Sequence, residues 1–137
     1  MAFDDKFRLS SHAVIIRQGV TGPCVLLLKA TYGDCAWGLP GGALEPGETI
    51  HEALQRECIE ELGVVVKVSY LTGVYYHQTY DSQAFIFLCE LENEAAIRLS
   101  DEHSDYQFVP LESLSSVQKQ RVQDCLNYDG IVLSRKF

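Results

Sequence analysis

Positive charge is scarce in this sequence. Its 137 residues include 11 Lys and Arg against 19 Asp and Glu, a net charge of -8, and the basic residues are scattered rather than grouped. This pattern argues against binding to a nucleic-acid polymer or to an anionic membrane surface. A protein of this charge that handles phosphates should need a cation to bring them close.

Long apolar stretches are also missing. No run approaches the roughly 20 apolar residues that cross a bilayer, and the opening residues MAFDDKFRLSS lack the apolar core of a secretion signal. We therefore predict a cytoplasmic protein with no membrane partner. Because 47% of the residues are hydrophobic, the chain can bury one core, and we predict a single domain over residues 1–137.

Closely spaced cysteine pairs are absent as well. The chain has five cysteines, an odd number, and no two of them stand near each other in the sequence. This spacing favours neither a disulfide framework nor a zinc motif. We therefore expect reduced thiols.

Stretches rich in β-branched and aromatic residues predict a sheet. The turn-forming cluster QGVTGP separates the first two stretches, so they should pair as a hairpin. After the last strand, a proline precedes a predicted helix over residues 111–128, whose apolar residues fit helical spacing loosely. The predicted strands are residues 7–17, 24–30, 64–80, 82–91 and 106–110. The apolar residues of the last helix are Leu114, Val117, Val122, Cys125 and Leu126.

The clearest helix in the sequence covers residues 50–62. Thr49 is a suitable N-cap, and Glu52, three residues on, completes a capping box. Gly63 stands where a helix ends in a left-handed residue. Before the helix, the Pro-Gly pair at residues 46–47 occupies the second and third positions of a predicted turn. A loop followed by a helix with well-marked ends is therefore predicted.

Three glutamates of this helix are closely spaced. Glu57, Glu60 and Glu61 stand at i, i+3 and i+4, so they fall within roughly a 100° arc, beside the apolar ridge that should pack on the sheet. Each exposed i, i+4 repulsion costs about 0.2–0.5 kcal/mol, and the helix dipole disfavours acids near the C-terminal end. Arg56 alone cannot neutralise the group, whereas oxygen ligands at this spacing suit hard cations such as Mg²⁺ or Mn²⁺. A solvated acidic helix face is the alternative interpretation.

The stretch GGALEPGETIHEALQRECIEELGV, residues 41–64, resembles the Nudix box. In that box, glycine, glutamate, an Arg-Glu pair, a Glu-Glu pair and a second glycine recur at fixed distances before an aliphatic residue. One position departs from the pattern, because Cys58 stands where an aliphatic residue is usual, but a buried thiol behaves as a small hydrophobe. The preceding WGLPGG and the predicted order of strands are also similar to this family. The matching residues of box 42–64 are Gly42, Glu48, Arg56, Glu57, Glu60, Glu61, Gly63 and Val64.

The resemblance implies both a fold and a reaction. The fold would be α/β (α+β), an α/β/α sandwich with a mixed β-sheet and a catalytic loop-helix-loop. The reaction would be hydrolysis, by water, of the pyrophosphate of a nucleoside diphosphate linked to some group X. The cofactor would be Mg²⁺, with Mn²⁺ as the alternative, which would screen the polyanion and lower the pKa of a bound water. The implied metal ligands are Glu57, Glu60, Glu61 and the backbone carbonyl of Gly41.

The resemblance also assigns supporting roles. Arg56 and Glu48 would form a pair that orients the metal ligands. Gly42, which has no Cβ, would let the backbone approach a substrate phosphate. Glu102 is similar to the later-loop glutamate that serves many members as a general base, although others use a glutamate of the box. Tyr80 lies near the position where dinucleoside polyphosphate hydrolases of the family carry a tyrosine.

The identity of X stays open at this point. Nucleoside triphosphates, dinucleoside polyphosphates, ADP-ribose and nucleotide sugars are all candidates, because loop shape rather than the box selects among them. A non-catalytic Nudix-fold module that binds or senses a nucleotide is the rival hypothesis, although the box here is intact. Homodimers are frequent among similar proteins. Other aromatic residues that could stack on a base, but that are more often core or sheet residues, are Tyr32, Trp37, Tyr75, Tyr76 and Phe108.

Overall fold

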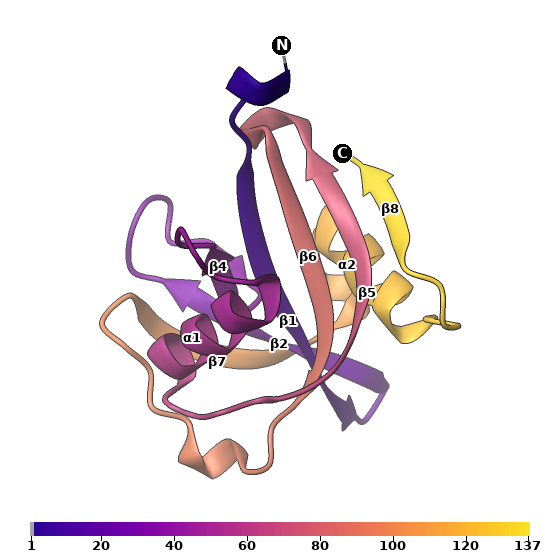
Figure 1. Cartoon of the computed structure of the whole chain (residues 1–137). Coiled ribbons are helices and arrows are strands. Elements are labelled where there is room, and N and C mark those ends of the chain that lie inside the picture. Colours follow the sequence, from indigo (N-terminus) through magenta and orange to yellow (C-terminus); the bar gives the residue numbers. More distant parts are fainter. Residues whose placement is uncertain (1) are drawn as a thin grey trace.

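The computed structural model describes residues 2–137 (Figure 1). The strands are β1 (Arg8–Gly19), β2 (Gly22–Ala30), β3 (Trp37–Gly38), β4 (Gly41–Ala43), β5 (Lys67–His77), β6 (Ser82–Glu90), β7 (His103–Pro110) and β8 (Leu133–Lys136). The helices are α1 (Ile50–Leu62) and α2 (Ser116–Leu126). Short 3-10 turns lie at Ala2–Asp4, Gln78–Tyr80, Glu94–Ala96 and Leu111–Ser113.

The strands form one eight-stranded mixed sheet with β1 at its centre. The first part of β1 pairs with β6 in parallel and with β4 antiparallel, and its last residues pair antiparallel with β2. The predicted hairpin is therefore confirmed, with Ile16 opposite Val25 and Gly19 opposite Gly22. β5 joins β6 antiparallel and β8 in parallel, and β2 also pairs with β3 and β7. Figure 1 shows β1, β6 and β5 side by side, with β8 at the edge.

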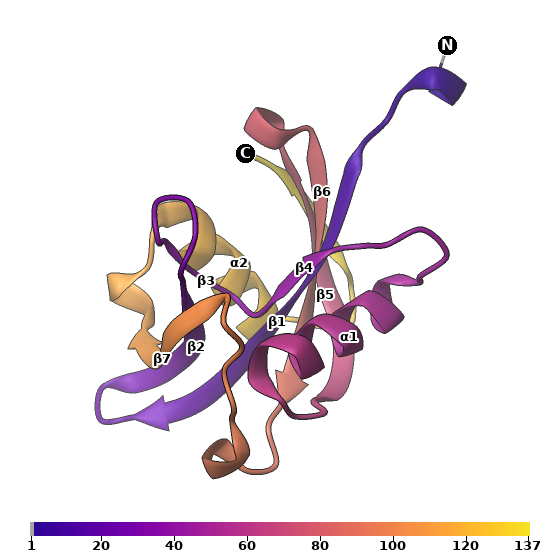
Figure 2. The same ribbon diagram turned by 90° about the vertical axis from the view of Figure 1, so that its left-hand side faces the viewer.

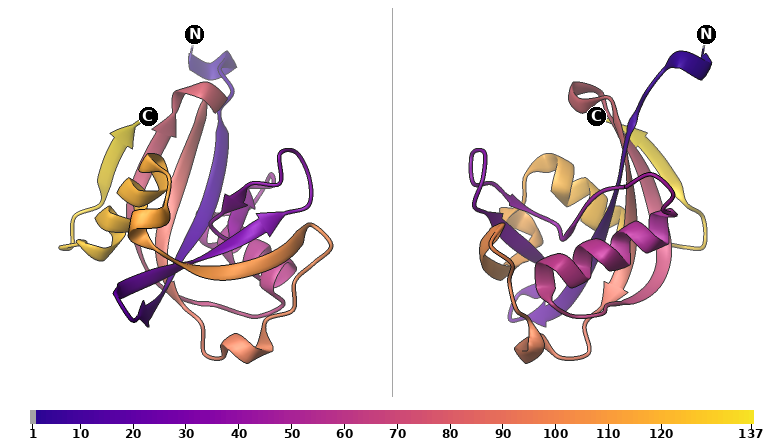
Figure 3. Two further views of the ribbon diagram at one scale, coloured as in Figure 1. Left: turned by 180° about the vertical axis from the view of Figure 1, so that it is seen from behind. Right: turned by 60° about the vertical axis from the view of Figure 1, so that its left-hand side comes forward.

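The two helices cover opposite faces of this sheet. Successive side chains of a strand point to opposite faces, and on β1 Ala13 and Ile15 pack in the core with α1, whereas Val14 packs in the core with α2. Figure 2 shows the strands between α1 and α2, and the two views of Figure 3 bring each helix forward in turn. The predicted α/β/α sandwich is thus confirmed. α1 contributes Leu54, Cys58 and Leu62 to its core, and α2 contributes Val122 and Cys125.

The C-terminal helix begins later than predicted. Leu111–Ser113 is a separate 3-10 turn, Leu114 is extended with φ -81° and ψ 155°, and α2 starts only at Ser116. The cause is local, because the side chain of Ser115 caps the helix by accepting a hydrogen bond from the backbone N–H of Gln118 at 3.3 Å. Within residues 2–137, neither helix is long and apolar enough to cross a membrane.

Several strand boundaries also differ from the predictions. β5 begins at Lys67 rather than at residue 64, and β7 begins at His103 rather than at residue 106. Three short strands, β3, β4 and β8, were not predicted. In the predicted apolar stripe of the last helix, Leu126 is 39% exposed, so it does not contribute to the core. These differences leave the two-faced sandwich unchanged.

Candidate active site

Two glycines fix the loop that leads to α1. β4 pairs with β1 so that Gly41 lies opposite His12. Gly41 has φ +139°, and a Cβ there would come within 2.1 Å of the carbonyl oxygen of Ser11. A Cβ on Gly42 would lie 2.7 Å from the carboxyl group of Glu57. Gly41 therefore requires glycine, because of its positive φ and the nearby backbone of Ser11, whereas a side chain at Gly42 would displace the Glu57 carboxyl group.

The ends of α1 form as predicted. The Thr49 hydroxyl accepts a hydrogen bond from the backbone N–H of Glu52 at 3.1 Å, and the Thr49 backbone N–H donates to the Glu52 carboxylate at 3.0 Å. Gly63 is left-handed at φ 70°, and its N–H donates to the carbonyl of Ile59 at 2.9 Å. In the preceding Pro46–Gly47 turn, the glycine has φ +89°. The capping box, the terminal glycine and the turn are all confirmed, and they set the position of α1 against the sheet.

The three glutamates near the end of α1 differ in their exposure. Glu61 is 5% exposed, whereas the side chains of Glu57 and Glu60 are 15% and 56% exposed. The carboxylate of Glu61 accepts a hydrogen bond from the backbone N–H of Gly41 at 2.9 Å. A nearly buried carboxylate loses the hydrogen bonds of water, and a single neutral donor replaces only part of them. The acids therefore extend from solvent, at Glu60, into the interior, at Glu61.

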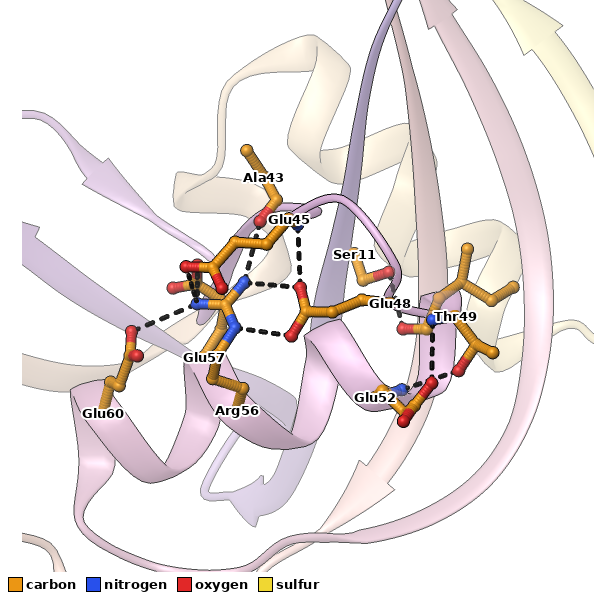
Figure 4. A network of polar contacts seen from close by, with 10 residues as sticks. Ser11, Ala43, Glu45, Glu48, Thr49, Glu52, Arg56, Glu57 and Glu60 are labelled. Carbon is orange, nitrogen blue, oxygen red and sulfur yellow. Dashed lines mark hydrogen bonds and ion pairs between the residues drawn. The ribbon is translucent and has the colours of Figure 1, made fainter.

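Arg56 is the centre of a polar network on this side of α1 (Figure 4). Its guanidinium donates to both oxygens of Glu48, from Nε at 2.7 Å and from Nη2 at 2.9 Å. Nη2 also donates to the carbonyl of Ala43 at 3.0 Å. Nη1 donates to Glu57 at 2.9 Å and to Glu60 at 3.3 Å. The Arg56–Glu48 contact is thus present, and it ties the loop to the helix.

Burial changes the pKa values of these acids. It raises the pKa of Glu61 to about 8, against the opposing effect of the Gly41 N–H, and the neighbouring carboxylates add to the rise. Burial also raises the pKa of Glu57, although its hydrogen bond from Arg56 acts in the opposite direction. By contrast, the hydrogen bond from Arg56 lowers the pKa of Glu48. The ionised forms of Glu57 and Glu61 are therefore poorly compensated by their surroundings, whereas the ionised form of Glu48 is well compensated.

Glu102 lies on the loop before β7 and faces the same region. Its backbone carbonyl accepts a hydrogen bond from the N–H of Thr31 at 2.9 Å, which ties this loop to the end of β2. After the effect of burial, the charge of Glu102 contributes to the raised pKa values of Glu57 and Glu61. The structure therefore brings Glu102 near the acids of α1, although they are some 40 residues apart in the sequence.

Two neighbouring cavities open beside β4. The smaller, of about 330 Å³, is lined by Gly41, Glu61 and Tyr32 among others. The larger, of about 580 Å³, is lined by Tyr80, which is not among the residues of the smaller cavity. Tyr80 and Gly42 thus line the same cavity, whereas Glu57, Glu60 and Glu61 do not line it. The residues that line both cavities are His12, Trp37 and Gly42.

The other aromatic residues that were considered for base stacking have different surroundings. Trp37 and Tyr32 each line a cavity next to the box. Tyr75 is fully buried in the core, and Phe108 packs against the core beneath a surface arginine. Tyr76 donates its hydroxyl hydrogen to an aspartate at the end of the β5–β6 connection. Trp37 and Tyr32 are therefore the two of this group that line cavities beside the box.

The acids of α1 suit a divalent cation in their chemistry. Their donors are carboxylate oxygens, which hard cations prefer, and the missing Cβ of Gly42 lets the Glu57 carboxyl group lie against the loop backbone. Among residues 2–137, no group of three or more His, Cys, Asp or Glu is already arranged to hold a metal ion. Arg56 holds one oxygen of Glu57 and one of Glu60. Metal binding would therefore use the remaining oxygens or shift these side chains away from Arg56.

Comparison with known proteins gives the family. The model of the NUDIX domain matches residues 6–125. A MutT-like protein of Streptomyces ambofaciens is 38% identical over 82 residues, which are 60% of this chain and 51% of that protein. An ADP-ribose pyrophosphatase of Methanocaldococcus jannaschii is 30% identical over 118 residues, covering 80% of this chain and 69% of that protein. The match thus spans about half the length of the Streptomyces relative and about two thirds of the Methanocaldococcus relative.

The fold agrees with this result. The crystal structure of an ADP-ribose pyrophosphatase from Streptococcus suis superposes with a TM-score of 0.76 at 18% identity, covering 96% of this chain and 100% of that one. At this identity, the superposition speaks for the fold alone. Since the family model covers most of the sequence, the chain belongs to the NUDIX family, and the resemblance of its box to that family is confirmed.

The polar residues of the larger cavity were not predicted from the sequence. Arg121 and Gln118 of α2 and His77 of β5 all line it. A signal was present, because Arg121 stands four residues after Val117 and four before Cys125, which places it on the apolar face of its helix. An arginine on such a face is a candidate for a buried polar site.

Proposed function

We propose that this Nudix-family hydrolase is a divalent-metal-dependent pyrophosphohydrolase that cleaves the phosphoanhydride of a small nucleoside diphosphate-X. Nucleoside triphosphates, dinucleoside polyphosphates, ADP-ribose and nucleotide sugars are the proposed substrate classes. Mg²⁺ is the proposed cofactor, with Mn²⁺ as the alternative. We further propose that the protein acts on free nucleotides in the cytoplasm, where it folds as one domain and can form a homodimer.

The observation that carries this proposal is the excess of negative charge at the end of α1. Arg56 is already held by both oxygens of Glu48, so it offers a single nitrogen to Glu57 and Glu60. Glu61 is nearly buried, its pKa is raised to about 8, and it receives a backbone N–H in place of a cation. Acids in this state are stabilised by a bound cation, and a cation here would also attract an anionic substrate.

Each residue of the site has a proposed role. Glu57, Glu60, Glu61 and the Gly41 carbonyl would hold the divalent cation, which would supply charge screening and a more acidic water. The Glu48 carboxylate fixes the guanidinium of Arg56, which in turn keeps the Glu57 carboxylate in place. The missing Cβ of Gly42 lets the diphosphate approach this surface.

A carboxylate must also take the proton of the attacking water. Glu102 is one candidate, because it is exposed on the loop before β7 and its charge reaches Glu57 and Glu61. A glutamate of the box is the other candidate. A Glu102→Gln variant distinguishes these two candidates. If Glu102 is the base, the variant should have a lower kcat, and its kcat should no longer reach a plateau at high pH. The stabilisation of the protein by the metal should persist.

The direct test of the function is turnover by Glu60→Gln and Glu61→Gln, compared with Glu112→Gln as a control. Glu112 is an exposed acid of the Leu111–Ser113 turn, so its substitution removes the same charge away from the box. Substrates from the four proposed classes are incubated with Mg²⁺ or Mn²⁺ in oxygen-18 water, and the products are identified by mass. We expect both box variants to lose turnover by orders of magnitude and to remain folded, and the control to behave as wild type.

Near-normal turnover by both box variants would refute the proposed site. If the wild-type protein instead bound nucleotides but hydrolysed none of the panel with either metal, the non-catalytic sensor module would be the better description. The position of oxygen-18 in the products also reports which phosphorus the water attacks.

A further inference from the structure

The larger cavity concentrates positive charge within an acidic protein. The chain has a net charge of -8, yet within residues 2–137 the lining of this cavity includes two arginines and no aspartate or glutamate. It also includes two histidines, of which His12 is uncharged at neutral pH because burial and the nearby Arg121 lower its pKa to about 4. These side chains come from three elements, with Arg8 and His12 on β1, His77 on β5 and Arg121 on α2. The fold therefore gathers residues that are far apart in the sequence.

Arg121 has no acidic partner in this cavity. Among the ion pairs of residues 2–137 it takes part in none, and its buried Nε has no hydrogen-bond partner. Its guanidinium carbon lies 5.7 Å from the ring of Tyr75 and 5.9 Å from the ring of Phe137. The two rings hold the side chain in place without satisfying its N–H groups. Burying a guanidinium away from water without a hydrogen-bond acceptor costs free energy. A bound anion would supply the missing acceptor.

Two further polar atoms of residues that line the cavity are buried and, within the described chain, make no hydrogen bond: Nδ1 of His77 and Oε1 of Gln118. Oε1 of Gln118 is an acceptor, so it would bind a donor group of the ligand rather than an anionic oxygen. Gln118 stands in the first turn of α2, whose N-cap residue Ser115 also lines the cavity. The positive end of the helix dipole is therefore directed to the same space as Arg121.

The position of the cavity connects it with the acids of α1. Gly42 lines it, and the carboxyl group of Glu57 lies directly against Gly42. A substrate whose diphosphate rests on this glycine can extend into the cavity. The volume of about 580 Å³ exceeds that of one phosphate, and the aromatic rings of Trp37 and Tyr80 offer surfaces to the group that carries it.

We propose that the larger cavity binds a phosphate group of the substrate other than the two that share the hydrolysed anhydride, with Arg121 as its main ligand. This assignment rests on the proposed function for the identity of the hydrolysed bond. It narrows the substrate class, because nucleoside triphosphates and dinucleoside polyphosphates carry such a phosphate, whereas ADP-ribose and simple nucleotide sugars do not.

The test measures anion binding without hydrolysis. Trp37 is the single tryptophan of the chain and lines both cavities, so its fluorescence reports on ligands in either, and the Arg121 variants assign the signal to the larger cavity. The complete protein, kept metal-free with a chelator, is titrated with inorganic phosphate, AMP and adenosine. We expect phosphate and AMP to bind, adenosine to bind more weakly, and Arg121→Gln to weaken AMP binding by about 10-fold or more.

The matched control is Lys119→Gln. Lys119 lies on the same helix and carries the same charge, but it is not among the residues of the cavity. This variant should bind AMP as the wild type does, and Arg121→Lys should recover part of the affinity that Arg121→Gln loses. Equal behaviour of Arg121→Gln and Lys119→Gln, or adenosine binding as tight as AMP binding, would overturn the proposal. Thermal unfolding of each variant confirms that it is folded.

The substrate panel separates this proposal from the proposed function. With Mg²⁺, Arg121→Gln should raise KM for triphosphate-containing substrates more than for ADP-ribose. A wild-type protein that hydrolyses nothing in the panel, but binds phosphate through Arg121, would refute the hydrolase and leave the anion site standing. Active hydrolysis without any effect of Arg121→Gln on binding or on KM would refute the anion site alone.

Discussion

The two helices each carry an arginine–carboxylate network, and the two networks differ in charge balance. In α2, the carboxylate of Asp124 accepts four hydrogen bonds, two of them from Arg135 at 2.6 and 2.9 Å. The hydroxyl of Tyr75 donates to it at 2.9 Å and the amide of Gln120 at 2.8 Å. One acid faces one arginine and two neutral donors, so its charge is matched. This network joins α2 to β5 and β8.

In α1, one arginine faces an excess of acids. Arg56 lies within 4 Å of four glutamate side chains, and the nearly buried Glu61 receives a backbone N–H instead. The comparison teaches that burial of a carboxylate does not by itself indicate function. A matched buried acid is costly to separate from its partners, whereas an unmatched one is a candidate site for a cation.

Among the variants that compare the two networks, the largest effect is expected from Arg56→Lys, which disturbs the unmatched network. Lysine cannot bind both oxygens of Glu48 and also reach Glu57, because it lacks the planar fork of arginine. We expect turnover to fall on the order of 10- to 100-fold. The control is Arg17→Lys, since Arg17 contacts both oxygens of Glu94 at 2.8 and 3.0 Å on the exposed surface. If both variants lost turnover equally, Arg56 would have no special role in positioning.

Substitutions in the matched network around Asp124 should lower the stability of the fold but should leave metal binding unchanged. Asp124→Ala leaves the buried hydroxyl of Tyr75 without its acceptor, which should lower the free energy of unfolding by about 1–3 kcal/mol. Urea denaturation measures this loss. The gain in melting temperature on adding Mg²⁺ should remain, because it arises at α1. Loss of that gain would show that the two networks are not separate.

The same network predicts a dependence of stability on pH. Burial alone would raise the pKa of Asp124, but the hydrogen bonds from Arg135, Tyr75 and Gln120 lower it below its usual value of 3.8. The unfolded state therefore binds the proton more tightly, so the stabilisation is present above about pH 3.8 and is lost as pH falls through the folded-state pKa. Urea midpoints measured between about pH 2 and pH 6 should fall less steeply in Asp124→Asn than in the wild type. Parallel curves would contradict this assignment.

The smallest effect is expected at the start of α1. Thr49→Ala removes the side-chain half of the capping box and should cost about 1 kcal/mol of stability. Because Glu57, Glu60 and Glu61 lie two to three turns further along, turnover at low temperature should stay near that of the wild type. A large loss of turnover in a folded Thr49→Ala variant would mean that the start of the helix positions the acids more strongly than the contacts indicate.

Local signals were enough to predict the loop and helix of the site. The turn at Pro46–Gly47, the capping box of Thr49 and the terminal Gly63 all depend on residues a few positions apart, and each formed as predicted. The spacing of the acids likewise placed them on one side of α1. The contact between Arg56 and Glu48 was predicted from the resemblance and is present in the structure.

Features that depend on distant pairing could not be predicted in this way. β8 has four exposed residues and pairs with β5, some 60 residues earlier in the chain. The depth of burial of Glu61 depends on β4, which is held by β1. The cavity around Arg121 needs α2 packed across the sheet, so the sequence shows only an arginine on an apolar face. The assignments of Glu102 and Tyr80 to catalysis and substrate binding stay predictions.

The central claim is that the acids of α1 lack a sufficient counterion until a divalent cation binds. Anomalous diffraction from crystals of the complete chain soaked in Mn²⁺ tests it most directly. The account predicts a manganese peak within about 2.5 Å of carboxylate oxygens of Glu57 and Glu61. No peak there at saturating Mn²⁺, with Glu57 still bound to Arg56 and Glu61 still bound to the Gly41 N–H, would contradict it.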